Sequence, residues 1–303
     1  MTERRAGVVL AHFSDVHLTV PQLGWVLRDL ATKRVTGWFH LRALGRGKRF
    51  EHAEAVTRAM VAEFRMRRPD ALVFPGDATA LGFATELAHA AKRLHVGEAE
   101  LPPGIAVPGN HDYYTPPAVH SGAFEQEFAP WLKGVRIDEH VYPLARQVGP
   151  VWLVGVNSST ANLQPWDASG EVGAAQRDRL RRLLGRLDSG PRILVTHYPV
   201  CLANGEPETR WHGLRDLDQV VKVAADGGVC LWLHGHRHVA YWIQQPPQAP
   251  FPVICCGSAT QTGRGSYGEY TIEGEFLHAV RRVFDVATGK FRDGERFEVK
   301  LGR

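Results

Sequence analysis

Five short motifs rich in aspartate and histidine recur along the chain, each after an apolar run. In order they are Ser14-Asp15-Val16-His17, Gly76-Asp77, Gly109-Asn110-His111-Asp112, Thr196-His197 and His234-Gly235-His236. Carboxylate and amide oxygens combined with imidazole nitrogens suit Fe, Mn, Zn or Co better than Ca or Mg. The donors suffice for two neighbouring ions, and metal pairs about 3.5–4 Å apart commonly hydrolyse phosphoesters. The motifs therefore predict a two-metal centre that cleaves a phosphorus–oxygen bond.

The apolar runs before the motifs predict the strands that position them. Runs without polar alternation are typical of strands buried on both faces, and they cover residues 7–13, 71–74, 105–107, 151–156, 192–196 and 229–233. Helical patterns alternate with these runs at 51–68, 85–94, 173–187 and 217–225. This alternation predicts a layered α/β fold whose site lies beyond the carboxyl ends of the strands. Later runs, at 253–257, 267–272, 276–283 and around Phe291 and Phe297, predict antiparallel strands that complete a second sheet.

Length and composition predict one domain over residues 1–303. Hydrophobic residues make up 44% of the chain, enough for a substantial core, and the net charge of +4 is too small to indicate nucleic-acid binding. The first apolar run is interrupted by His12 and Asp15, so it does not predict a signal peptide, and no run approaches the ~18 residues of a membrane span. We therefore expect a cytoplasmic protein. Four cysteines without a Cys-x-x-Cys pair predict free thiols.

A basic insertion at about residues 20–50 separates the first motif from the first long helical pattern. It contains seven basic residues and one acid. Leu23, Val26, Leu27 and Leu30 fall at helical spacing and predict one apolar stripe. Two interpretations stay open. The insertion is either a cap packed on the core with a solvated basic edge, or a basic amphipathic segment that lies on a membrane surface.

The order and content of the motifs resemble the calcineurin-like metallophosphoesterase superfamily. Its series of Asp-x-His, Gly-Asp, Gly-Asn-His-Asp/Glu, His and Gly-His-x-His is matched over residues 15–236. The resemblance implies a four-layer α-β-β-α sandwich of two mixed sheets flanked by helices. It also implies two transition-metal ions (Mn, Fe or Zn) and a metal-bridging hydroxide as the nucleophile.

The same resemblance implies a role for each motif residue. The first metal is expected to be bound by Asp15, His17 and His236, and the second by Asn110, His197 and His234. Asp77 is expected to bridge the two metals. His111 is expected to stabilise or protonate the leaving oxygen, with Asp112 orienting its ring. His238 is expected at the rim of the pocket or in solvent.

Departures from the superfamily pattern bear on the substrate. Asp112 replaces the usual Glu, and no Asp-x-Val-Asp-Arg-Gly follows Gly76, which disfavours phosphoprotein phosphatases. The retained His111 resembles bacterial phosphodiesterases, so phosphodiester hydrolysis is the favoured activity. The alternative is a lipid-linked pyrophosphate or phosphodiester hydrolase at the inner membrane face, similar to UDP-diacylglucosamine pyrophosphohydrolases, some of which carry Arg in place of His111. A nuclease and a metal-free scaffold are less favoured.

Residues near the motifs are candidates for contacts with the substrate. Arg215, His212, Asn157 and Tyr198 lie close in sequence to the predicted strand ends. Arg215 is suited to bind a phosphate oxygen through a forked contact. The expected partner is thus a small-molecule or lipid-linked phosphoester, with membrane contact through residues 22–50 in the second case. The sequence does not indicate an oligomeric state.

Overall fold

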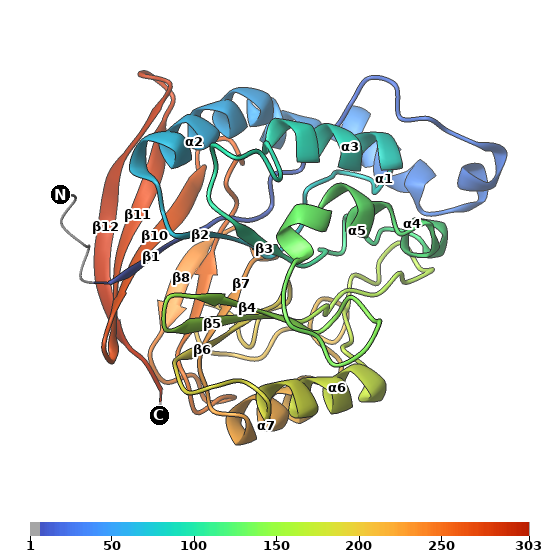
Figure 1. Cartoon of the computed structure of the whole chain (residues 1–303). Helices are drawn as coiled ribbons and strands as arrows, with labels where there is room; N and C mark the ends of the chain where they lie inside the picture. The colour runs from blue at the N-terminus through green and yellow to red at the C-terminus, as the bar shows by residue number, and fades with distance from the viewer. Residues whose placement is uncertain (1–6, 303) are drawn as a thin grey trace.

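Two six-stranded β-sheets lie face to face between two layers of helices (Figure 1). The computed structural model describes residues 7–302. Helices α2 (Ala53–Arg67) and α3 (Ala84–Arg93) cover one sheet, and α6 (Ala174–Leu184) and α7 (Leu217–Asp226) cover the other. The main buried cluster combines side chains of both sheets. This arrangement confirms the expected four-layer α-β-β-α sandwich.

The first sheet has the order β12-β11-β10-β1-β2-β3. Its strands, in chain order, are β1 (Val8–His12), β2 (Ala71–Phe74), β3 (Gly104–Ala106), β10 (Ser266–Glu273), β11 (Phe276–Asp285) and β12 (Lys290–Lys300). The first three strands are parallel, while β10 pairs antiparallel with β1. The expectation that these C-terminal strands complete a second sheet is therefore wrong. All five residues of β1 are buried, and its second edge is satisfied by β10, with Val8 opposite Ile272.

The second sheet has the order β4-β5-β6-β7-β9-β8. Its strands are β4 (Leu144–Val148), β5 (Val151–Gly155), β6 (Arg192–Val195), β7 (Val229–His234), β8 (Ala240–Ile243) and β9 (Val253–Cys256). Strands β5, β6, β7 and β9 are parallel. Of the predicted C-terminal strands, β9 alone joins this sheet. The carboxyl ends of β6 and β7 face those of β1–β3 across the two sheets, which brings the motifs together.

Residues 20–50 form a protruding lobe, called the cap below, beside α3 (Figure 1). It contains a 3₁₀ turn η1 (Leu27–Ala31), helix α1 (Arg34–Arg42) and a second 3₁₀ turn η2 (Gly47–Phe50). The expected amphipathic helix over Leu23–Leu30 does not form, because Gly24 adopts a left-handed φ of 77° and interrupts it. Leu23 is buried, whereas Leu27 and Leu30 are 87% and 62% exposed.

Three short helical elements follow the third motif and had no clear sequence signal. They are α4 (Pro116–Ser121), α5 (Ala123–Glu127) and a 3₁₀ turn η3 (Ala129–Leu132). All four cysteines are free and buried, as expected. Across residues 7–302, no helix combines the length and apolar character that a membrane crossing requires.

Candidate metal centre

The motif residues stand in turns directly after parallel strands of both sheets. Asp15 follows β1, Asp77 follows β2, and Asn110 comes soon after β3. His197 and His236 follow β6 and β7 of the facing sheet. Because the carboxyl ends of parallel strands meet at one edge of a sheet, these side chains converge on one buried region.

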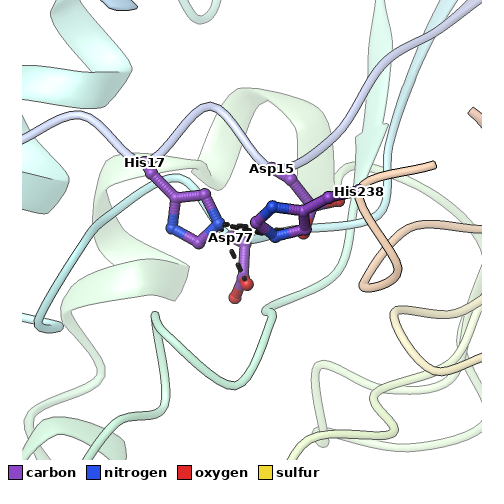
Figure 2. Close-up of side chains that lie close together, drawn as sticks. All are labelled: Asp15, His17, Asp77 and His238. Carbon is purple, nitrogen blue, oxygen red and sulfur yellow. Dashed lines mark hydrogen bonds and ion pairs between the residues drawn. The ribbon is translucent and has the colours of Figure 1, made fainter. Parts of the chain in front are cut away.

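Asp15, His17, Asp77 and His238 form the first group of donors (Figure 2). One ligand atom from each lies within 4.8 Å of the others. His17 Nε2 and His238 Nε2 are 3.1 Å apart, and His238 Nε2 is 3.1 Å from Asp15 Oδ1. His17 Nδ1 lies 3.0 Å from the carbonyl of Thr79 and donates to it, so its Nε2 lone pair faces the group. A histidine ligand whose other nitrogen is held by a backbone carbonyl is a recurrent feature of metal sites.

Asn110, His197 and His236 form the second group. Asn110 Oδ1 lies 3.0 Å from both His197 Nε2 and His236 Nδ1, and these two nitrogens are 3.2 Å apart. His197 Nδ1 lies 2.7 Å from the carbonyl of Pro75 and donates to it, so its Nε2 presents a lone pair. Lone pairs of oxygen and nitrogen atoms this close repel one another unless a cation or proton lies among them. The second group therefore also fits a metal ion.

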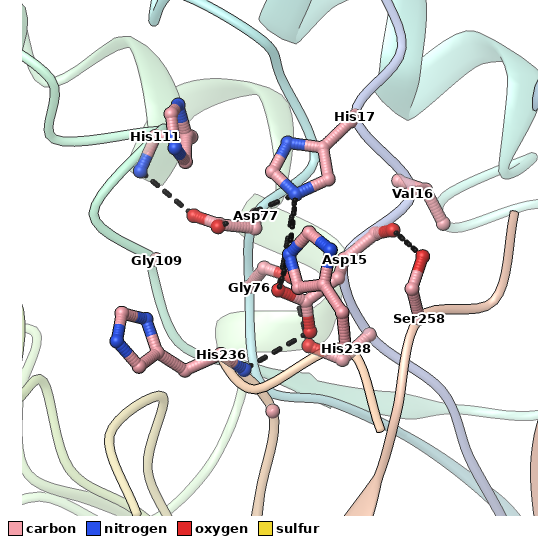
Figure 3. Close-up of polar contacts among 12 residues, drawn as sticks. Asp15, Val16, His17, Gly76, Asp77, Gly109, His111, His236, His238 and Ser258 are labelled. Carbon is pink, nitrogen blue, oxygen red and sulfur yellow. Dashed lines mark hydrogen bonds and ion pairs between the residues drawn. The ribbon is translucent and has the colours of Figure 1, made fainter. Parts of the chain in front are cut away.

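Asp77 connects the two groups. Its Oδ2 lies 3.6 Å from His17 Nε2 and 3.6 Å from His197 Nε2. Its Oδ1 accepts a 2.7 Å hydrogen bond from the backbone N–H of His111, which fixes the carboxylate (Figure 3). Burial, and then the neighbouring Asp15, raise the pKa of Asp77 well above its usual range. Two carboxylates buried this close together require positive charge, which bound metal ions would supply.

The remaining ionisation states also suit metal binding. Burial is the main cause that lowers the pKa of His17, His197 and His236, so these imidazoles are neutral and available as ligands at neutral pH. Burial opposes ionisation of Asp15, but His238, His197 and His17 together outweigh it and hold the pKa of Asp15 below its usual range. Correspondingly, Asp15 raises the pKa of His238 against the effect of burial.

The backbone is strained at the same residues. Asp15, His17, Asp77, His236 and His238 have φ values of 55°, 44°, 57°, 70° and 55°. Positive φ costs energy in residues other than glycine and is concentrated at functional sites. The left-handed turns aim successive side chains at the centre instead of letting them alternate as in a strand.

Two motif glycines are required by close packing around the carboxylates. A Cβ atom on Gly109 would lie 2.1 Å from Asp77 Oδ1. A Cβ atom on Gly235 would lie 2.1 Å from Ser14 Oγ and 2.6 Å from Asp15 Oδ2. Since neither distance leaves room for a methyl group, only glycine lets these backbones approach the centre.

The histidines after β7 are grouped differently from the sequence assignment. His238, which was expected at the rim, lies in the first group, and His236 lies in the second group instead of the first. His234 belongs to β7, where its ring packs 5.6 Å from Tyr241 and burial lowers its pKa to about 4. Its Nε2 makes no hydrogen bond within residues 7–302. When the Gly-His-x-His pattern is aligned with Gly235, its two histidines are His236 and His238, so the motif itself indicated this grouping.

Asp112 contacts the backbone of the motifs and not the ring of His111. Its two carboxylate oxygens accept hydrogen bonds from the backbone N–H groups of Asp77, Gly109 and Thr79. The ring of His111 is instead oriented by the carbonyl of Ala80, 2.8 Å from its Nδ1. The role expected for Asp112 is thus replaced by one in which it fixes the turns of the second and third motifs.

The suggested substrate contacts lie apart from the donor groups or serve the fold. Arg215 pairs with Glu171 at 2.8 Å, and the exposed His212 contacts Thr209. The Asn157 side chain accepts from the N–H of Ser159, which shapes its own loop. Tyr198 does reach the centre, with its ring 4.6 Å from that of His236.

The cap reaches the centre, which no sequence signal indicated. The Phe50 ring lies 4.6 Å from His17 and 5.8 Å from His238. Arg46 Nη2 lies 2.8 Å from His111 Nε2. A segment that the sequence shows only as a basic insertion therefore forms one wall of the site.

Taken together, a buried carboxylate–imidazole centre between the strand ends of two facing sheets defines a metallophosphoesterase. A family model described as calcineurin-like phosphoesterase matches residues 8–240. The chain belongs to this family of phosphoester hydrolases, whose members use two metals. No curated protein matches the sequence with statistical support.

Solved structures with the same fold share little sequence with the chain. A dimetal phosphatase from Danio rerio has a TM-score of 0.65 at 14% identity, covering 98% of this chain and all of that one. Purple acid phosphatase PPD1 from yellow lupin has a TM-score of 0.60 at 12% identity, covering 98% of this chain and 54% of that one. GAP50, the anchor in the inner membrane complex of Plasmodium, has a TM-score of 0.58 at 10% identity, covering 99% and 90%. At these identities the likeness shows the fold alone.

Proposed function

We propose that the protein is a hydrolase of phosphodiesters that works with two transition-metal ions (Mn, Fe or Zn). The observation that carries this proposal is the position of Asp77 Oδ2, 3.6 Å from both His17 and His197. One carboxylate oxygen between the imidazoles of His17 and His197 is the arrangement that a bridging ligand needs. Asp15, His17 and His238 would hold one ion, and Asn110, His197 and His236 the other.

The residues of the chain position the donors and restrict water. When bound, the ions would supply Lewis acidity to the phosphoryl oxygens and lower the pKa of a coordinated water. Thr79 and Pro75 carbonyls fix the rings of His17 and His197, so the donors are preorganised. Phe50 covers the side of the centre next to His17.

A cavity between the cap and the centre supports a diester over a monoester. It has a volume of about 320 Å³ and is lined by His17, Leu18, Leu41 and Phe50, among others. A diester carries an organic group on each side of phosphorus, and this cavity beside His17, whose lining combines apolar side chains with Arg42, Glu51 and Glu54, would accept the second one. A monoester would leave this cavity without a partner.

A second candidate is a lipid-linked phosphoester or pyrophosphate at a membrane surface. Leu27, Leu30, Phe39 and Leu44 of the cap are 87%, 62%, 52% and 62% exposed. The single acid of the cap, Asp29, is buried in an ion pair with Arg34, so the exposed charges of the cap are all basic. Exposed apolar side chains among basic ones suit an anionic lipid surface.

The diester proposal is tested on the Mn-loaded protein with bis-p-nitrophenyl phosphate and p-nitrophenyl phosphate. We expect kcat/KM to be higher for the diester, and Asp77→Ala to remove turnover of both. Faster turnover of the monoester would contradict the choice of diester. Two bound metals with no turnover of either ester would contradict the proposed activity.

The membrane candidate is tested by sedimentation with liposomes of phosphatidylglycerol and phosphatidylcholine. We expect Leu27→Ser/Phe39→Ser to lose binding, whereas Met66→Ser/Val286→Ser, which changes exposed apolar residues elsewhere, retains it. Equal binding by the two double variants, or no binding by the wild type, would remove this candidate. A soluble diester substrate would then be favoured.

A further inference from the structure

Two cations of the cap lie beside His111, and neither forms an ion pair within residues 7–302. Arg46 Nη2 lies 2.8 Å from His111 Nε2 and 3.2 Å from its Nδ1. The ring of Tyr114 stacks on His111 at 5.2 Å, and Lys33 Nζ lies 4.7 Å from the centre of the Tyr114 ring. We call Arg46, Lys33 and Tyr114 the cap subsite.

The other inward-facing arginine of the cap is neutralised, in contrast to these two. Arg34 is buried, pairs with Asp29 at 2.6 Å and donates to the carbonyls of Leu81 and Gly82. It anchors the cap, and its charge is already neutralised by the buried carboxylate of Asp29. A partly buried cation without a carboxylate is costly unless a ligand supplies the anion. The difference identifies Arg46 and Lys33 as the cap residues available to a ligand.

The two cations of the cap subsite lie close to the metal centre. Arg46 is half-buried against the ring of His111, and Lys33 is half-buried over the ring of Tyr114. Burial lowers the pKa of Lys33 to about 8, although Asp167 acts in the opposite direction. Both cations are thus partly removed from water, and an anion placed beside them would bind strongly.

The hydrogen bonds of His111 limit what it can do for a leaving group. Its Nδ1 donates to the carbonyl of Ala80 at 2.8 Å, so its Nε2 accepts from Arg46. In this arrangement Nε2 carries no proton to give to a departing oxygen. A leaving group that needs little protonation matches this site better than an alkoxide does.

We propose that Arg46 and Lys33 bind a second phosphate of the substrate, which makes the substrate a pyrophosphate diester. This inference rests on the proposed function and names the leaving group at the same centre. Water oxygen forms a bond to the attacked phosphorus while the bond from that phosphorus to the bridging oxygen breaks. The bridging oxygen keeps the electron pair and leaves as part of a phosphomonoester. The products are two phosphomonoesters. At a pH above the second pKa of these products, both protons of the water molecule pass to solvent.

The test uses the Mn-loaded full chain and two substrates that differ by one phosphate. These are bis-p-nitrophenyl phosphate and symmetric di-p-nitrophenyl pyrophosphate, with products followed by phosphorus NMR. We expect Arg46→Gln to lower kcat/KM for the pyrophosphate 10- to 100-fold more than for the monophosphate diester, which corresponds to about 1.4–2.7 kcal/mol. Lys33→Met should act in the same direction, and Arg46→Lys should restore part of the loss. Arg49→Gln, which changes an exposed cation in the 3₁₀ turn that follows Arg46, is the control that leaves both rates unchanged.

The outcomes separate this inference from the proposed function. Equal loss on both substrates in Arg46→Gln would mean that Arg46 only holds His111, and would overturn the subsite. A wild type that cleaves the monophosphate diester but not the pyrophosphate would overturn it as well, with the proposed function intact. Turnover of neither substrate by the metal-loaded protein would contradict the proposed function itself.

Discussion

Replacing Asp112 by Asn tests whether this carboxylate supports the turns of the centre or orients His111. Asp112 Oδ2 accepts from the N–H groups of Asp77 and Gly109 at 2.8 and 2.9 Å, and Oδ1 accepts from that of Thr79 at 3.1 Å. Whichever way the new amide turns, its NH₂ faces at least one buried N–H donor. The least costly orientation leaves the Thr79 N–H without an acceptor.

The expected cost follows from these bonds. One buried N–H without an acceptor costs about 1–3 kcal/mol, and weakening two bonds to a charged acceptor adds about 1 kcal/mol. We therefore expect Asp112→Asn to lower the free energy of unfolding by about 2–4 kcal/mol, or the Tm by roughly 4–16 °C. Burial, followed by Asp77, raises the pKa of Asp112 to about 7, so the carboxylate is ionised at pH 8.5, where the comparison belongs. Because a raised pKa means that the folded protein disfavours the charged form, Asn also relieves part of the cost of burying this charge, and the expected loss lies at the lower end of the range.

The assay combines thermal unfolding with metal affinity. Asp216→Asn is the matched control, because Asp216 also accepts from two backbone N–H groups, those of Val172 and Gly173, but outside the centre. Both variants should lose stability, and only Asp112→Asn should also bind metal more weakly, since it fixes Asp77. An unchanged Tm with a loss of more than about 100-fold in kcat at saturating metal would refute this reasoning and restore the orienting role.

Three further perturbations test the centre. His238→Ala should lose one of two bound metals, whereas His234→Ala should keep both, as measured by metal analysis after dialysis; the reverse result would restore the sequence assignment. Gly109→Ala should abolish binding of both metals, because its Cβ would lie 2.1 Å from Asp77 Oδ1, and retained stoichiometry would contradict that geometry. Removing metal with a chelator should lower the Tm by roughly 8–16 °C, since ligand at 1,000 times its Kd stabilises by about 4 kcal/mol; an unchanged Tm would indicate that the groups do not hold metal.

Much of the fold follows from local sequence pattern. Ala71–Phe74 and Val151–Gly155 are continuous apolar runs because helices and the facing sheet bury both faces of these strands. The placement of β10 beside β1 could not be predicted from the sequence, since pairing between distant segments leaves no local signal. The same holds for the cap, where one left-handed glycine, Gly24, decides against a helix that the apolar spacing favours.

The site was predictable in its residue types more than in its grouping. Asp15, His17 and Asp77 come together because each follows a parallel strand at a motif of unambiguous spacing. Histidine occupies every second position from 234 to 238, and this regularity does not reveal where β7 ends. The Gly-His-x-His pattern that starts at Gly235 marks His236 and His238, and the left-handed backbone at both residues turns their imidazoles toward the centre. Arg46 was missed because the path of an insertion depends on tertiary packing.

The most direct test of the central claim is the number of metal ions per chain. The protein is dialysed against Mn, Zn or Fe, and bound metal is counted by mass spectrometry in the wild type and in Asp77→Ala. We expect two ions per wild-type chain and a loss of both in the variant, because Asp77 Oδ2 joins the two groups. One ion or none in a wild type that still hydrolyses phosphodiesters would contradict a two-metal centre, and two retained ions in Asp77→Ala would contradict the bridge.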